Sequence, residues 1–131
     1  MNEILHPEGW VRPRGFSHGM SGSGRLIFVA GQIGSDKNGR LVSADFASQA
    51  ATALRNIVEV LASGGAGAAD IVRLTWYVTD KREYLAETQR IGELYREIIG
   101  PHYPAMTLVQ VADLLEDGAK VEIEATALAA S

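Results

Sequence analysis

Residues 121–127 constrain the fold more than any other stretch of this sequence. Val121, Ile123, Ala125 and Ala127 alternate there with Glu122, Glu124 and Thr126. A period of two is typical of a β-strand that has one face on a hydrophobic core. The two glutamates lie one pleat apart on the other face and repel each other, so that face needs water or a hydrogen-bond donor. A solvated sheet face is the simplest interpretation.

Further strands follow from the same kind of pattern. Residues 103–128 predict two strands joined by an acidic turn, and residues 71–79 place Leu74, Trp76 and Val78 on one strand face. Residues 16–21 predict a short strand, residues 25–30 predict an apolar strand buried on both faces, and 41–42 predict a brief pairing after the Asn38-Gly39 turn. Residues 1–13 show no periodicity and predict an extended arm.

Two helices are predicted between the strands. The first has an apolar stripe, a cap at Ser43 or Asp45, and a stop at Gly64-Gly65. Its stripe consists of Phe46, Ala50, Leu54, Ile57 and Leu61. The second runs from a capping box at Asp80 and Glu83 to about residue 99. We expect it to bury Leu85, Ile91, Leu94, Tyr95 and Ile98.

The chain is predicted to form one domain over residues 1–131, an α+β fold with both helices on one face of a mixed sheet. No third helix is available for the other face, so a partner subunit is expected to cover it. Apolar residues make up 47% of the chain and charged residues 21%, as in a globular domain. The start lacks a signal peptide and no stretch is long enough for a membrane helix, so we expect a cytoplasmic protein without a membrane partner.

Several kinds of site are not supported by the sequence. The net charge is −4 and the basic residues are scattered, which argues against nucleic acid as a partner. His6, His18 and His102 lack the spacing of metal motifs, so we expect no metal. Neither a nucleotide-binding loop nor a nucleophilic serine or cysteine motif is present, and we expect no cofactor.

Two groups of motifs resemble one known family. The first is Pro104-Ala105 followed by Val121-Glu122-Ile123-Glu124-Ala125, and the second comprises residues 15–19 and 26–34. In their order and spacing they resemble the reactive intermediate deaminase (Rid, YjgF-like) superfamily, also labelled endoribonuclease L-PSP. The resemblance implies a chorismate-mutase-like fold and a homotrimer with a central β-barrel. It also implies that small-molecule ligands bind in clefts between the subunits.

The resemblance also implies roles for individual residues. Glu122 matches the catalytic glutamate that holds or activates water, and Gly31 matches a backbone donor to the substrate. Phe16 stands where most deaminases have tyrosine, so the ring remains and the hydroxyl is gone. Met106 occupies the position of the arginine that binds the substrate carboxylate, and Leu108 that of a cysteine. A thioether offers no hydrogen-bond donor, so ordinary deamination of small 2-imino acids is not expected.

Other residues leave alternatives open. Arg12, Arg14 or Arg73 could restore a cation to the cleft, although each is also compatible with a solvated surface position. His18, next to the aromatic position, could act as a donor or acid, or have a structural role. Gly92 stands where an asparagine is usual. Two functional hypotheses therefore remain: a hydrolase for a neutral or bulkier imine or enamine, and a non-catalytic protein that binds an apolar or planar metabolite. Ribonuclease action ranks below both because of the charge.

Overall fold

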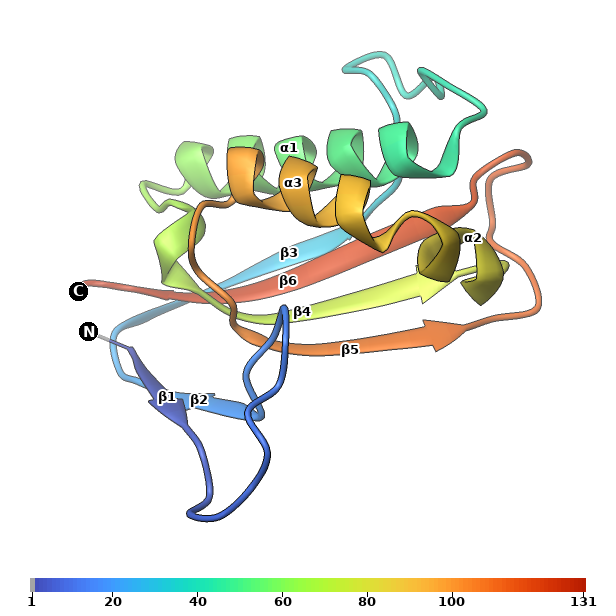
Figure 1. Ribbon diagram of the computed structural model, residues 1–131. Helices are drawn as coiled ribbons and strands as arrows, with labels where there is room; N and C mark the ends of the chain where they lie inside the picture. Colours follow the sequence, from blue (N-terminus) through green and yellow to red (C-terminus); the bar gives the residue numbers. More distant parts are fainter. Residues whose placement is uncertain (1) are drawn as a thin grey trace.

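The computed structural model describes residues 2–131 as one sheet covered on one face by helices, with a small hairpin beside it (Figure 1). The sheet order is β3-β6-β4-β5, in which β3 and β4 are antiparallel to β6 and β5 is parallel to β4. The four strands are β3 (Arg25–Gln32), β6 (Val121–Ala129), β4 (Ile71–Val78) and β5 (Ala105–Gln110). This confirms the predicted α+β fold with a mixed sheet.

The first helix, α1 (Phe46–Ser63), forms as predicted. The Asp45 carboxylate caps it by accepting a 3.0 Å hydrogen bond from the Ser48 N–H, and Gly64 ends it. The apolar stripe packs on the sheet and forms the core with residues of β4 and β6, among them Leu74, Ile123 and Ala127. The buried alanines of α1, Ala47, Ala50, Ala51 and Ala53, have little or no exposed surface, and their small side chains let the helix lie close to the strands.

The second predicted helix is divided into α2 (Lys81–Ala86) and α3 (Thr88–Ile98), with a break at Glu87. Tyr84 packs edge-on against Trp76 and Phe46, which anchors α2 at the end of the sheet while α3 runs beside α1 (Figure 1). Two expectations were wrong here. Leu85 is exposed rather than buried, and the Glu83 side chain pairs with Lys120 at 2.9 Å instead of completing a capping box.

The N-terminal segment contains a small hairpin that the sequence did not predict. Strands β1 (Glu3–Leu5) and β2 (Gly19–Ser21) pair antiparallel and lie beside the sheet in Figure 1. Residues 1–13 are therefore not simply an extended arm, and the strand predicted over residues 16–21 is limited to its second half. Met1 lies outside the described residues.

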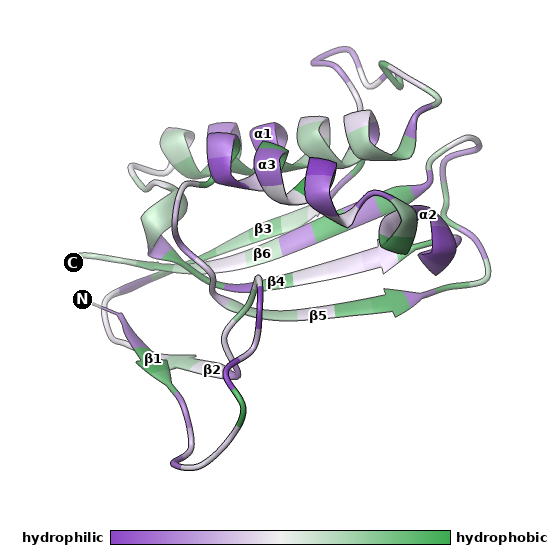
Figure 2. Cartoon of the chain, in the orientation of Figure 1, coloured by the Kyte–Doolittle hydropathy of each residue, from purple (hydrophilic) through white to green (hydrophobic). Residues whose placement is uncertain are grey.

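The helix-free face of the sheet differs from expectation at β3. This strand was predicted to be buried on both faces, but Phe28 is 72% exposed and Leu26 is 53% exposed in the single chain. Both lie on the face without helices, because their β6 partners Thr126 and Leu128 alternate with the buried alanines. In Figure 2 most of β3 has the green colour of hydrophobic residues.

The two C-terminal strands are present but are not neighbours. The segment after β5 carries the acidic turn, and β6 then enters the sheet on the far side of β4. None of the helices within residues 2–131 has the length and apolar character needed to cross a membrane. A short 3₁₀ turn, η1 (Ala68–Asp70), connects α1 to β4.

Candidate functional site

The Glu122 carboxylate lies directly against the backbone of Gly31. A Cβ atom built on Gly31 would overlap the Glu122 side chain, with its Cδ only 2.8 Å away. The close approach arises because the pairing of β3 with β6 is interrupted by a bulge between Val29 and Gln32. The structure thus brings together two of the residues that the sequence assigned to a site.

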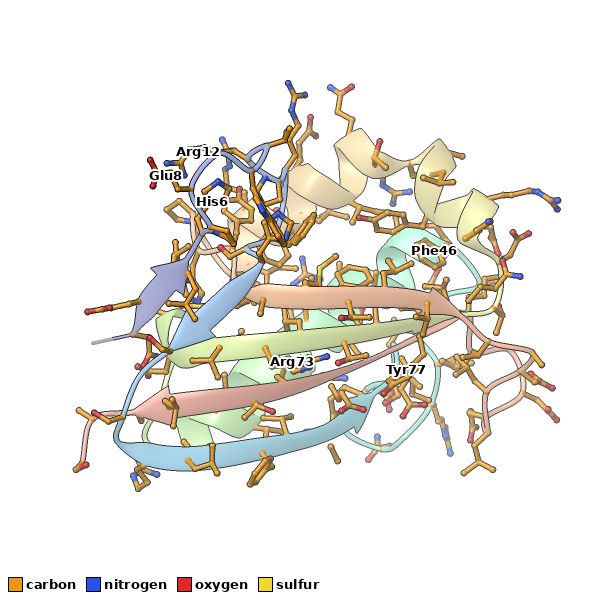
Figure 3. The ribbon with its side chains drawn as sticks, turned by 90° about the horizontal axis from the view of Figure 1, so that it is seen from below. His6, Glu8, Arg12, Phe46, Arg73 and Tyr77 are labelled. Atoms are coloured by element: carbon orange, nitrogen blue, oxygen red, sulfur yellow. The ribbon has the colours of Figure 1, made fainter. Side chains whose placement is uncertain are left out.

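Polar side chains surround Glu122 on the helix-free face. Tyr77 stands opposite Glu122 on β4, and its hydroxyl donates a 2.9 Å hydrogen bond to Oε1 of Glu124. This bond, together with burial and the nearby carboxylates, raises the pKa of Tyr77 above its ordinary value. Arg73 lies on the same face and donates to Thr107 at 3.4 Å. Figure 3 views this face, with Arg73 and Tyr77 over the strands.

Met106 and Leu108 lie on the opposite face of the sheet from Glu122. In the parallel β4–β5 pairing, Met106 stands beside Leu74 and Leu108 beside Trp76, and all four contact the helix-side core. Within one chain Glu122 and Met106 therefore cannot hold one small ligand between them.

A cavity of about 640 Å³ opens on the helix side. It lies between α3, the strands β4 and β5, and the turn at Arg14-Gly15. Its floor and walls are largely aromatic or apolar: Trp76, Tyr84, Ile91, Tyr95, Tyr103 and Met106. Burial raises the pKa of Tyr84, and it raises the pKa of Tyr95 well beyond the usual range, so both walls are neutral phenols at physiological pH. Such a cavity suits a ligand with a flat or apolar body.

Charged side chains lie at the exposed rim of this cavity. Arg14 and Arg96 contribute two positive charges and Glu93 one negative charge. Arg96 donates to the Tyr103 hydroxyl at 3.4 Å, and this bond raises the pKa of the guanidinium further. Arg14 makes no ion pair or side-chain hydrogen bond with any residue of the described chain. Of the three candidate cations, Arg14 lines the cavity, whereas Arg12 and Arg73 do not.

Trp76 has a donor without an acceptor. Its side chain is 2% exposed, and Nε1 is the buried side-chain nitrogen or oxygen atom within residues 2–131 that has no hydrogen-bond partner. Buried indole N–H groups usually find a partner, because an unpaired buried donor is unfavourable. The sequence placed Trp76 in the core and missed this. The sequence feature that could have indicated an unpaired N–H is a tryptophan on a strand face whose other residues are all apolar.

Phe16 and His18 belong to a separate ring cluster beside the cavity. The His18 ring packs edge-on against Phe16 at 5.6 Å and against Trp10 at 5.0 Å, with His6 at 5.9 Å. Neither Phe16 nor His18 lines the cavity, although Arg14 and Gly15 immediately precede them. Gly92, on α3, does line the cavity together with Met106. Residues 2–131 contain no group of three or more side chains placed to hold a metal ion.

Comparison with known proteins gives consistent matches over this architecture. A family model described as "Endoribonuclease L-PSP" matches residues 11–129. The 2-iminobutanoate/2-iminopropanoate deaminase of Homo sapiens is 34% identical over 105 residues, 79% of this chain and 73% of that protein. The crystal structure of YyfB, a Rid family protein of unknown function from Yersinia pestis, superposes with a TM-score of 0.85 at 34% identity, covering 98% of both chains. TdcF of Escherichia coli, solved with bound serine, gives a TM-score of 0.68 at 30% identity, covering 98% of this chain and 99% of that one.

Proposed function

Because the chain belongs to the endoribonuclease L-PSP (Rid, YjgF) family, we propose that it is a homotrimer that hydrolyses imine or enamine metabolites in clefts between subunits. The observation that carries this proposal is the division of the candidate residues between two faces of one sheet. Glu122 and Gly31 lie on the helix-free face, and the cavity with Met106 lies on the helix side. A cleft that contains both needs two chains.

Exposed apolar residues support self-association. Leu26 and Phe28 on β3 and Val109 on β5 are exposed on the helix-free face, which no helix covers. Burial of apolar surface favours association, and symmetric homo-oligomers bury such faces against copies of themselves. In the proposed trimer these faces form the central barrel, and each Glu122 faces the cavity of the next subunit.

The proposed reaction needs one carboxylate and one water. Glu122 accepts a proton as the water oxygen attacks the imine carbon, and it passes this proton to the nitrogen as the carbon–nitrogen double bond opens. Glu122 then accepts the hydroxyl proton of the tetrahedral adduct as the carbonyl forms, and it delivers this proton to the nitrogen, which leaves as ammonia. The sum is imine plus water to carbonyl plus ammonia, with no co-reactant. A positioned carboxylate of this kind typically contributes about 10²–10⁴-fold to the rate.

The substrate is proposed to be bulkier or less charged near the imine than 2-iminopropanoate. Met106 has no donor for a carboxylate next to the reacting carbon, and the walls around it are aromatic and apolar. Hydrolysis of 2-iminopropanoate and 2-iminobutanoate is therefore expected to stay near the uncatalysed rate. A rate equal to that of an arginine-bearing relative measured in parallel would contradict this substrate class.

The test of the reaction is the Glu122→Gln variant. Imines of increasing side-chain size are generated in situ by oxidation of amino acids, and the carbonyl product is measured above the uncatalysed rate. Acceleration by the parent protein and its loss in Glu122→Gln support hydrolysis; equal rates in both proteins contradict it.

A binding protein without turnover is the second candidate. It is favoured by the absence of two groups that the resemblance associates with deamination, the arginine at Met106 and the hydroxyl at Phe16. In that case native mass spectrometry with a crude metabolite extract shows one retained compound per site, and no imine is converted faster than in buffer.

A further inference from the structure

We propose that Tyr77 is a positioning residue that gives the two glutamates of β6 different roles: it holds Glu124 by a hydrogen bond on the β4 side and leaves Glu122 as the carboxylate that meets the water. The inference rests on the proposed function, because it explains how the carboxylate of that reaction is kept in place. The two glutamates lie one pleat apart on the same face, and the alternation of β6 alone does not rank them.

The two glutamate side chains lean toward opposite neighbours of β6, which lies between β3 and β4 in the sheet. Glu122 leans toward β3, so close to Gly31 that a Cβ atom added there would overlap its carboxylate. Glu124 leans toward β4, where its Oε1 accepts the 2.9 Å hydrogen bond from Tyr77. Two like charges one pleat apart repel each other, so this arrangement keeps the two carboxylates separate.

Tyr77 is placed to act on both glutamates. The strand register puts it directly beside Glu122, whereas Thr75 is the direct neighbour of Glu124, so the Tyr77 hydroxyl reaches Glu124 along the diagonal. An aromatic side chain is long enough for such a diagonal contact between antiparallel strands. Figure 3 shows Tyr77 on this face of the sheet. The hydrogen bond forms within one chain, so it does not depend on the proposed trimer.

No basic side chain replaces this hydrogen bond. Within residues 2–131 neither glutamate of β6 forms an ion pair. Arg73, the cation of β4, stands opposite Thr126 and donates to Thr107 instead. The hydrogen bond to Glu124 is the main cause that raises the pKa of Tyr77, followed by burial and the nearby carboxylates, so the hydroxyl stays a donor at neutral pH. Tyr77 is therefore the group that restrains Glu124.

The first test needs no turnover. NMR follows the side-chain carboxyl carbons of the full-length protein as the pH is changed, and the Glu122 signal is identified by its loss in Glu122→Gln. In Tyr77→Phe the pH at which Glu122 titrates should rise by about half a unit, because the unrestrained Glu124 charge can approach it. Adding Glu124→Gln should return it to the parent value or below. An unchanged titration in Tyr77→Phe, or one that stays raised without the Glu124 charge, overturns the inference.

The second test is kinetic. Tyr77→Phe keeps the ring and should lower kcat for imine hydrolysis about tenfold with KM unchanged, because the carboxylate is less well fixed while the cavity is intact. Adding Glu124→Gln should recover most of this loss, since the interfering charge is gone. Adding Glu97→Gln instead is the matched control, which removes one negative charge from an exposed position on α3 and should recover nothing. No loss in Tyr77→Phe, or equal recovery by the two second changes, contradicts the positioning role.

The two tests together distinguish a failure of this inference from a failure of the proposed function. If the titration of Glu122 and kcat both change as expected, both stand. If the titration follows Tyr77 and Glu124 but the parent protein hydrolyses no imine, the arrangement of the two carboxylates stands and the proposed reaction fails. If the parent protein hydrolyses imines through Glu122 while Tyr77→Phe keeps the parental titration and rate, only the positioning role of Tyr77 fails.

Discussion

Glu122 and Gly31 are in contact so close that any side chain at position 31 would displace the carboxylate. The contact links the bulge in β3 to the start of β6, and it limits the positions that the Glu122 carboxylate can occupy. Gly31 is exposed in the single chain, so its lack of a side chain is not required by core packing. The contact is a positioning feature on the helix-free face.

Gly31→Ala is expected to lower imine hydrolysis tenfold or more, because small displacements of a catalytic group have effects of about this size. The new methyl group would occupy the position of the Glu122 side chain. Product formation measured beside the unfolding midpoint checks the prediction. Gly67→Ala is the matched control, since its added Cβ meets no atom within 4 Å. Unchanged turnover in Gly31→Ala would show that the contact does not position the carboxylate.

Met106→Arg combined with Phe16→Tyr is expected to raise hydrolysis of 2-iminobutanoate well above the parent, by roughly a hundredfold if half of the restored binding is realised. The arginine would enter the helix-side cavity, where Glu93 is an available partner and Arg14 and Arg96 oppose it. The specificity constant is the quantity to measure. Adding Glu122→Gln should abolish the gain; a triple variant as active as the double would remove Glu122 from the catalytic role.

Phe28→Asp is expected to break the assembly. Light scattering of the parent protein at micromolar concentration should give three times the 14.1 kDa chain mass, and Phe28→Asp should give a smaller species. The reason is that Phe28, 72% exposed in one chain, is proposed to be buried between subunits, where a carboxylate would be unfavourable. Leu115→Asp, at a residue 99% exposed in a loop, should leave the mass unchanged. A monomeric parent protein would contradict the trimer.

Asp45→Ala is expected to lower the free energy of unfolding by about 1 kcal/mol at pH 7, the usual effect of removing a helix N-cap. Hydrogen bonds from the Ser48 hydroxyl and N–H lower the pKa of Asp45, with a smaller effect of Arg90. A carboxyl group whose pKa is lowered by folding stabilises the fold at pH values above its pKa in the unfolded chain. This stabilisation is lost as the pH falls through its pKa in the folded chain. The difference between variant and parent should therefore shrink as the pH falls through the lowered pKa of Asp45. Urea unfolding at one protein concentration checks this, with Asp117→Ala as an exposed control.

The sequence predicted the elements whose patterns are set by the core. The stripe from Phe46 to Leu61 and the alternation in β4 and β6 both reflect burial against the sheet, and those elements form as expected. The break at Glu87 was missed because it depends on Tyr84 packing on Trp76, a contact between segments that local pattern does not contain. The exposure of β3 in the single chain was missed because apolar composition does not distinguish a strand face that packs in the core from one that packs against another chain.

The candidate site was predictable only in part, for a similar reason. Glu122 and Gly31 are brought together by the pairing of β3 with β6, as their assignment to one site requires. Met106 and Glu122 come from strands two places apart, and their side chains leave opposite faces of the sheet. Trp76, Arg96 and the tyrosines line a cavity only because α3 lies over the sheet at this place. The spacing of these residues in the sequence does not indicate that α3 packs at this place.

Subunit mixing tests whether each site is shared between two chains. Two defective chains are needed: Glu122→Gln, which lacks the carboxylate, and Gly92→Trp, which obstructs the cavity from an exposed helix position with open space around it. The two are unfolded together, refolded in equal amounts, and assayed for imine hydrolysis. As a control, the chain that carries both changes is mixed with the parent in the same way.

If each site takes its cavity from one subunit and Glu122 from the next, about a quarter of the sites in either mixture are intact and about a quarter of parental activity should appear. If both halves come from one chain, the mixture of single variants stays inactive, and the control keeps about half of the parental activity. Sites shared between subunits should give recovery near a quarter in both mixtures. An inactive mixture of the two single variants would contradict it.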